Sequence, residues 1–164
     1  MAAFVLVATS FLHSAQNNWT GASGNNWFNN GNWSLGHYPV AGEDAVITNV
    51  GAAVLLTNST AWLSSLVISN KTLTCSNWST SIQATNVTIR RLATITLPTA
   101  FATNSMSNRV WISCGNLTID PGGKIDAIGR GYRTPQGTGM GRGHRHGAGA
   151  GYGGPAGALD RRTR

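Results

Sequence analysis

The sequence predicts an all-β fold in which short strands stack in successive coils, a parallel β-helix of about four coils. One short pattern is repeated, with apolar residues at its second and fourth positions and polar residues at its first and fifth. The copies are residues 44–48, 65–69, 86–90 and 116–120, so the first three are evenly spaced and the fourth starts later. Alternation with a period of two is typical of a half-buried strand. Regular recurrence at this spacing is typical of stacked coils rather than of a β-meander.

The composition supports stacked β-structure. Only 10% of the 164 residues are charged, Gly is abundant, and Asn, Ser and Thr fill the polar positions. After residue 15, no stretch shows the apolar spacing and the caps of an amphipathic helix. The length fits one domain or a part of one.

The net charge of +7 is concentrated near the end of the chain. Eight of the 12 Lys and Arg residues lie from Lys124 onward, whereas the residues before Lys124 are close to neutral. The repeat region therefore presents no basic field, and only the C-terminal segment could attract a polyanion.

Residues 1–15 are typical of a secretory signal peptide. An apolar run at residues 2–12 ends shortly before the polar Gln16, which predicts cleavage after Ala15 and export of the protein. The alternative interpretation is a buried first strand. Because the run is too short to cross a bilayer, we expect no transmembrane span.

Residues 16–43 are rich in Asn and Gly and contain Trp19, Trp27 and Trp33. Asn and Gly tolerate positive φ, so we expect irregular, turn-rich chain pinned by the three rings. The favoured interpretation is an aromatic N-terminal cap, since a solenoid needs a cover over its open core and unpaired edges. In the alternative interpretation, the same three tryptophans bind carbohydrate by stacking against sugar rings.

Residues 44–128 are expected to form the coils, each with three strands and with an insertion looped out at 98–107. Asn49 and Asn70 occupy equivalent turns and could form a ladder. The expected second strands are residues 53–57, 72–76, 93–97 and 124–128. The expected third strands are residues 61–63, 81–84 and 109–114. The expected inward ladders are Ala45/Leu66/Val87/Leu117 and Ile47/Ile68/Ile89/Ile119.

Two cysteines are too few for a disulfide framework. The repeat places Cys75 on the second strand of its coil and Cys114 on the third strand of the next coil, so they should face different directions. We expect two free thiols packed in the core, with a disulfide as the alternative.

Residues 129–164 form a Gly/Arg-rich segment in which nearly every second residue up to 158 is Gly. Such chain buries too little apolar surface to offset its backbone entropy, so we expect it to be flexible. Coil four would then lack a cap. Its exposed strand edge and its Leu117/Ile119 layer predict self-association.

The chain resembles secreted bacterial right-handed parallel β-helix proteins of the autotransporter-like and pectin-lyase-like surface group. The residues that carry this resemblance are Trp27, Trp33, 32–34, 39–47, the Ser-Leu-Val-Ile and Asn-Leu-Thr-Ile strands, 125–132 and 151–154. The resemblance implies a right-handed solenoid, in agreement with the general crossover rule. It also implies a Gly-rich insert and an N-terminal fragment of a longer β-helix.

The sequence contains no strong catalytic signature. Polysaccharide-cleaving sites need clustered carboxylates, and this chain has five acidic residues in all. Glu43 and Asp44 are adjacent and would point to opposite faces of a strand, and Asp120 and Asp126 only flank one turn. The two histidines within 143–147 are too few for a specific metal site. We therefore expect no catalytic residues, no bound metal and no cofactor.

The function that we predict is a secreted or cell-surface structural or adhesive module, with an extracellular polysaccharide as a candidate partner. One alternative is the non-catalytic N-terminal part of a polysaccharide lyase or glycoside hydrolase. Another is nucleic-acid binding through the Arg-Gly segments at 129–133 and 141–145. The export signal and the neutral repeat region argue against nucleic acid.

Overall fold

The computed structural model describes residues 14–48, 50–101 and 106–132. In these residues the fold is all-β, with a single short 3-10 helix, η1 (Asn30–Asn32). The strands are β1 (Gln16–Asn18), β2 (Asp44–Ile47), β3 (Val54–Leu56), β4 (Leu63–Ile68), β5 (Thr72–Cys75), β6 (Ile82–Ile89), β7 (Thr94–Thr96), β8 (Ile112–Ile119) and β9 (Lys124–Asp126).

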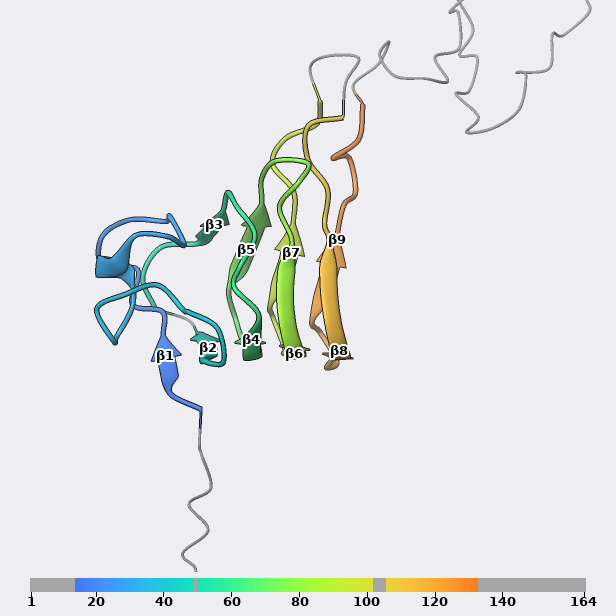
Figure 1. Cartoon of the computed structure of the whole chain (residues 1–164). Helices are drawn as coiled ribbons and strands as arrows, with labels where there is room; N and C mark the ends of the chain where they lie inside the picture. Colours follow the sequence, from blue (N-terminus) through green and yellow to red (C-terminus); the bar gives the residue numbers. More distant parts are fainter. Residues whose placement is uncertain (1–13, 49, 102–105, 133–164) are drawn as a thin grey trace, which may run out of the picture.

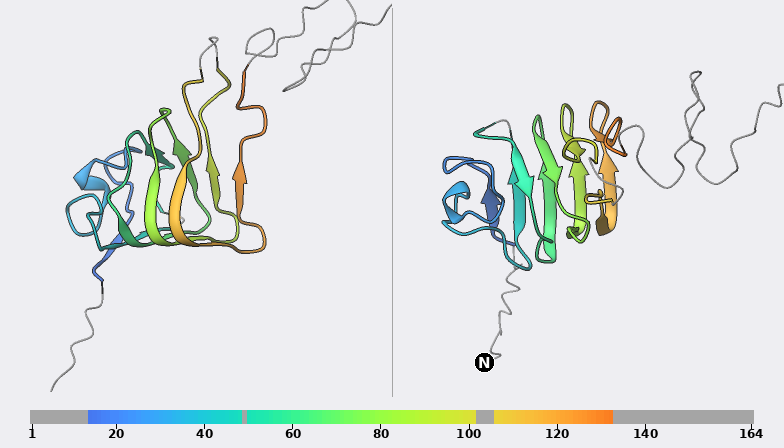
Figure 2. Two further views of the ribbon diagram at one scale, coloured as in Figure 1. Left: turned by 45° about the vertical axis from the view of Figure 1, so that its right-hand side comes forward. Right: turned by 90° about the horizontal axis from the view of Figure 1, so that it is seen from above.

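The strands form two parallel sheets. The five-stranded sheet has the order β1-β2-β4-β6-β8, and the four-stranded sheet has the order β3-β5-β7-β9. From β2 onward the chain alternates between the sheets. We call one strand of the five-stranded sheet and the following strand of the other sheet a layer. Figures 1 and 2 show the layers side by side, from the N-terminal region at one end to β8 and β9 at the other. The predicted all-β class and parallel pairing are confirmed.

Both predicted ladders are present in the five-stranded sheet. Ala45 pairs with Leu66, Leu66 with Val87 and Val87 with Leu117. The second ladder runs in the same way, through Ile47, Ile68, Ile89 and Ile119. The side chains of both ladders are buried in every layer except the last. The register follows from the sequence because a slip of one residue would turn all of these side chains outward.

The four-stranded sheet supplies the other half of the core. Its inward residues begin with Val54 and Leu56 in β3 and continue with Leu73 and Cys75 in β5. Its four strands fall within the predicted second strands of the coils. Apolar side chains from both sheets belong to one buried cluster, so the core lies between the sheets.

The prediction of a separate third strand in each coil is wrong. In β6 the predicted third strand and the following repeat form one continuous strand, and β8 is built in the same way. The inward alternation of β6 changes phase once, at the consecutive exposed residues Thr85 and Asn86. Gly115 lies beside this point in β8, where an added Cβ would lie 3.0 Å from the Thr85 carbonyl oxygen. The strand therefore turns a corner without ending.

The insertion and the Gly-rich segment meet at one point. Phe101 forms a parallel bridge with Tyr132, and the Phe101 amide donates to the Gly131 carbonyl at 2.9 Å. The two rings pack edge to face with centroids 5.4 Å apart. The start of the predicted flexible segment thus belongs to the fold. Residues 133–164, most of the predicted signal peptide and Asn49 of the predicted asparagine ladder lie outside the described residues.

The two cysteines lie in different sheets, Cys75 in β5 and Cys114 in β8, and both are free thiols. This agrees with the prediction of two unpaired thiols facing different directions. Cys75 is fully buried, and burial raises the pKa of its thiol to about 12. A thiolate at this position would be desolvated, so Cys75 packs as a small apolar side chain.

Candidate functional site

The three tryptophans predicted as a cap or as a carbohydrate site are buried. Trp19, Trp27 and Trp33 are 1%, 0% and 3% exposed. Trp33 packs edge to face against both others, with centroids 5.2 Å from Trp19 and 4.8 Å from Trp27. The Trp19 indole donates to the Ala52 carbonyl at 3.0 Å and the Trp33 indole to the Trp27 carbonyl at 2.7 Å. These rings cover the first layer of the core and leave no face for a sugar.

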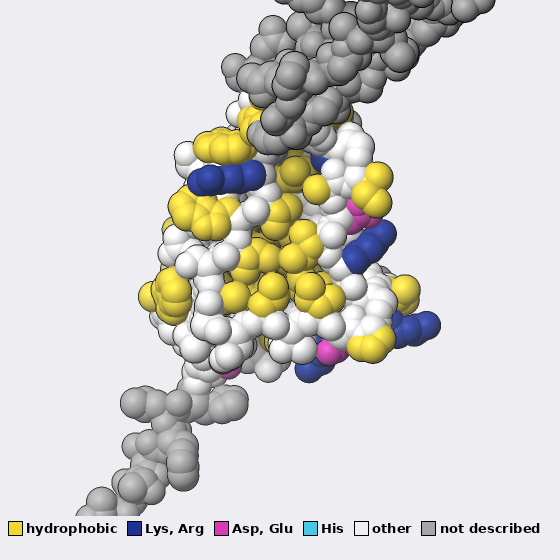
Figure 3. Space-filling view, turned by 90° about the vertical axis from the view of Figure 1, so that its right-hand side faces the viewer, with side chains coloured by type: hydrophobic (Ala, Val, Ile, Leu, Met, Phe, Trp, Pro, Cys, Tyr) yellow, Lys and Arg dark blue, Asp and Glu magenta, His cyan; other side chains and the backbone are white. Residues whose placement is uncertain are grey.

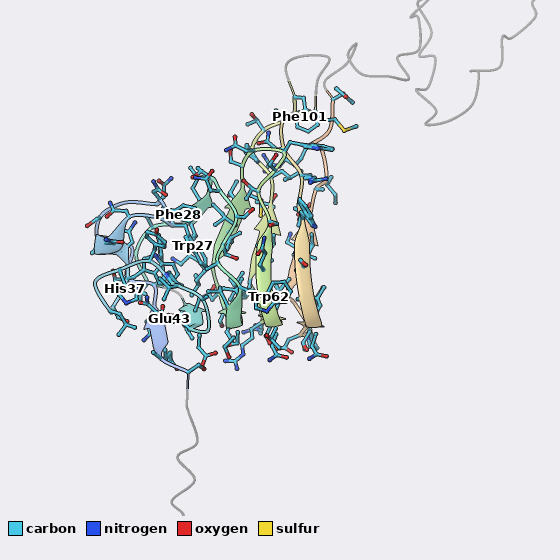
Figure 4. All side chains as sticks on the ribbon, viewed as in Figure 1. Trp27, Phe28, His37, Glu43, Trp62 and Phe101 are labelled. Atoms are coloured by element: carbon cyan, nitrogen blue, oxygen red, sulfur yellow. The ribbon has the colours of Figure 1, made fainter. Side chains whose placement is uncertain are left out.

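A polar network completes the cap. Asn17 pairs with Ala45 at the start of the ladder, is fully buried, and donates through Nδ2 to the His37 carbonyl at 2.8 Å. The Glu43 carboxylate accepts from the Val40 amide at 3.0 Å and lies 3.6 Å from His37 Nε2. Figure 4 shows His37 and Glu43 close together near β1. These contacts satisfy buried polar side chains of the cap, whereas Trp27 Nε1 is buried with no hydrogen-bond partner among the described residues.

Other tryptophans, which the sequence patterns did not single out, lie on the outside. Trp62, Trp78 and Trp111 are 49%, 42% and 45% exposed. The Arg109 guanidinium carbon lies 4.7 Å from the Trp78 ring centroid and 4.1 Å from that of Trp111. We call these three residues the Trp78–Arg109–Trp111 cluster. Its only local signals in the sequence are a tryptophan between Asn77 and Ser79 and the close spacing of Arg109 and Trp111.

A groove adjoins this cluster. It has a volume of about 420 Å³, and its lining comprises Thr57, Asn58, Ser59, Asn77, Trp78, Ser79 and Thr80. These residues come from the loops that follow β3 and β5, which lie in adjacent layers. The Asn77 Nδ2 group donates to the Thr57 carbonyl at 2.6 Å, and the Ser59 hydroxyl donates to the Ser79 carbonyl at 3.2 Å. The groove walls are therefore tied together across the layers.

The far end of the stack is an apolar face. Leu117, Ile119 and Ile125 are 45%, 46% and 40% exposed. They lie in β8 and β9, the last strands of the two sheets. Figure 3 shows hydrophobic side chains gathered at the centre of this face. We call it the open end. Its exposure agrees with the sequence prediction for the Leu117/Ile119 layer.

The described residues contain no group of three or more His, Cys, Asp or Glu side chains that could hold a metal ion. Asp126 accepts from the Ile128 amide and from Lys124 Nζ, each at 3.0 Å. The hydrogen bond from Ile128, and then the one from Lys124, lower the pKa of the Asp126 carboxyl. A stabilised carboxylate of this kind is a poor general acid. Asp44 accepts from the hydroxyls of Ser14 and Ser65.

Comparisons with known proteins found no matching family model, no similar curated protein and no similar solved structure. Within the described part of the chain, no helix is long and apolar enough to cross a membrane.

Proposed function

We propose that this chain is the capped end of a right-handed parallel β-helix that acts as a non-catalytic structural or adhesive module outside the cell. The observation that carries this proposal is the pair of apolar ladders, which run in register from the cap to the open end. Alternation between two parallel sheets is what a β-helix requires. The crossover rule and the resemblance to secreted right-handed β-helix proteins supply the handedness.

A scaffold role fits the distribution of chemical groups. The repeated layers build a stack whose outer surface carries many Asn, Ser and Thr side chains. Such a surface offers many hydrogen-bonding groups but few charges, which suits contact with polysaccharide. An adhesive partner of this kind would lie outside the cell, in agreement with the predicted signal at residues 1–15. The Arg-Gly segments lie mostly outside the described residues, so the nucleic-acid alternative receives no support from the fold.

A second candidate is the non-catalytic N-terminal part of a polysaccharide lyase or glycoside hydrolase. The observation that favours it is the open end, because further coils could stack on Leu117, Ile119 and Ile125. Catalytic carboxylates would then lie on those coils. This candidate and the scaffold role share the same capped stack and differ only in whether catalytic coils pack against the open end.

Cell fractionation and an activity assay test the scaffold role. The full chain, expressed with its own N-terminus, is expected in the extracellular or surface fraction, and a variant lacking residues 1–15 should stay in the cytoplasm. The exported protein should release no reducing ends or unsaturated sugars from a panel of neutral and acidic polysaccharides. Retention of the full chain in the cytoplasm would contradict export. Product formation by the purified chain would contradict a non-catalytic role.

We further infer that the open end pairs with a second copy of this chain. Unpaired strand edges bind other strands readily. The cap seals the opposite end, so copies cannot stack head to tail, and contact between two open ends closes at a dimer. The last layer carries both signs of charge, with Asp120 and Asp126 against Lys124 and Arg130. Two copies would therefore not repel one another strongly.

A further inference from the structure

The Trp78–Arg109–Trp111 cluster presents aromatic surface to solvent in a fixed position. The guanidinium of Arg109 is stacked on both rings, at 4.7 and 4.1 Å from their centroids. The Arg109 Nε is buried and has no hydrogen-bond partner among the described residues. Ring contacts therefore hold this guanidinium in place. A cation covers only one face of a ring, and both tryptophans remain nearly half exposed.

The groove beside Trp78 is polar but uncharged. Its lining contains amides, hydroxyls and one indole, and no acidic or basic side chain. The side chains of Asn58 and Ser79 form no hydrogen bond with any part of the chain that the structure describes, so their polar groups face solvent unpaired. In contrast, Asn77 is fixed by two hydrogen bonds. Its side chain donates to the Thr57 carbonyl, and its backbone amide donates to Asn108 Oδ1 at 2.8 Å. The walls are held in place, while the side chains of Asn58 and Ser79 remain available to a ligand.

We propose that this groove and the Trp78–Arg109–Trp111 cluster bind a neutral polysaccharide chain. This proposal rests on the adhesive role proposed above. A pyranose ring has an apolar C–H face and a rim of hydroxyls. The face matches an exposed indole, and the rim matches free amides and hydroxyls. A volume of about 420 Å³ lies in the usual range for ligand sites.

The arrangement also explains why the ligand is a chain rather than a single sugar. The groove lies between the first two layers, and Arg109 and Trp111 belong to the loop that leads into β8, the strand after β6 in the sheet. The binding surface thus continues across three successive loops, with polar groups on the first and stacking rings, Trp78 and Trp111, on the other two. Arg109 acts as a positioning residue, because it holds both rings and does not line the groove.

Binding of the full chain to soluble neutral glucan, xylan and mannan tests this proposal, with polygalacturonate as the acidic probe. We expect measurable affinity for at least one neutral polymer. Trp78→Ala and Trp111→Ala should each weaken it at least about tenfold, and Trp78→Phe should restore part of it. Trp62→Ala is the matched control, since Trp62 is equally exposed but lies outside the cluster. It should leave the affinity unchanged.

The role of Arg109 has its own readout. Arg109→Gln should weaken binding by several-fold and broaden the tryptophan fluorescence, because the rings lose the cation that holds them. Arg109→Lys should restore part of the polysaccharide affinity and part of the wild-type tryptophan fluorescence. Arg90→Gln, which removes an equal but distant exposed charge, should change neither.

Absence of binding to all three neutral polymers would overturn the proposal, as would binding to polygalacturonate alone. Neutral binding that survives both Trp78→Ala and Trp111→Ala would place the site elsewhere. Each variant should keep the wild-type melting temperature, so loss of binding would not reflect unfolding. An exported, non-catalytic protein that fails these binding tests would retain the scaffold role and lose only this site.

Discussion

The two ends of the stack treat the outermost layer of the core in different ways. At the N-terminal end, the ladder finishes in buried Asn17 and is covered by Trp19, Trp27 and Trp33. At the other end, this ladder finishes in Leu117 and the second ladder in Ile119, and both side chains are nearly half exposed. In this stack, the closed end is thus covered by irregular chain with large rings and internal amides. Repeating the strand pattern once more does not close it.

From this difference we expect that the position of a core side chain in the stack, rather than its residue type, decides how much it contributes to the free energy of unfolding. Ile47, Ile68, Ile89 and Ile119 share one residue type, one strand position and one ladder. Of these four, only Ile119 is exposed at the edge of the described stack. Identical substitutions along this ladder therefore measure the contribution of neighbouring layers.

The largest expected effect is the contrast between Ile68→Asp and Ile119→Asp. Ile68→Asp buries a carboxylate between two apolar neighbours, so we expect a loss of more than about 4 kcal/mol in the free energy of unfolding. Ile119→Asp leaves its carboxylate at the open end and should cost less than about 1 kcal/mol. Denaturant unfolding measures both. Equal losses for the two variants would mean that another element covers the open end.

Removing a ring from the cap should have the next largest effect. Trp33→Ala deletes the ring that packs against both Trp19 and Trp27, and we expect it to cost about 3–5 kcal/mol. Trp62→Ala serves as the control, because this exposed ring should contribute less than about 1 kcal/mol. If the two variants unfold at the same denaturant concentration, the cap does not stabilise the stack.

The open end should govern self-association. Light scattering of the full chain should give a mass that rises toward that of a dimer with concentration, because two apolar ends cover one another. Leu117→Lys combined with Ile119→Lys should weaken the self-association of the chain at least about tenfold, because like charges repel and apolar contact is lost.

The matched control for that variant lies on the cap, where Leu35 and Val40 are as exposed as Leu117. Leu35→Lys combined with Val40→Lys should leave the mass unchanged. A wild-type monomer at all concentrations would contradict pairing through the open end.

The last expected effect separates the two cysteines and is absent at neutral pH. Burial raises the pKa of Cys75 from 9.0 to about 12, so the unfolded state loses this proton at lower pH than the folded state. The free energy of unfolding should be unaffected below pH 9 and should fall by about 1.4 kcal/mol per pH unit between pH 9 and 12, relative to Cys75→Ala. At pH 8, Cys75 should also react with iodoacetamide more slowly than the half-buried Cys114.

If labelling is equally fast at both thiols, the interior layer opens as readily as the last one. If the pH dependence of Cys75→Ala matches that of the wild type, this thiol does not titrate as a buried group.

The ladders of the five-stranded sheet could be predicted from the sequence because each one depends only on a local period and on the regular recurrence of its copies. The continuous β6 and β8 were not predicted, since the corner at Thr85 and Asn86 is a change of phase inside a strand. In β6 no Gly or Pro marks this corner. Two consecutive polar residues between alternating segments are also what the sequence would show if one strand ended there and another began.

The candidate site was less predictable than the fold. Trp19, Trp27 and Trp33 were expected to act as a cap, and their burial removes them as sugar-binding residues. Trp78 and Trp111 are far apart in the sequence and are brought together only by the stacking of layers around the insertion. A separation along the chain that matches neither the spacing of the repeat nor a motif carries no local signal.

The pairing order of the two sheets makes the stack directional. Within the described chain, each strand pairs only with strands of the layers before and after it, so each layer is stabilised by its immediate neighbours. Among these layers, the first is the one anchored by the rigid, non-repetitive cap. Opening should therefore begin at β8 and β9, with amide exchange slowing layer by layer toward β2. Synthesis from the N-terminus would likewise provide each new strand with an already folded edge on which to assemble.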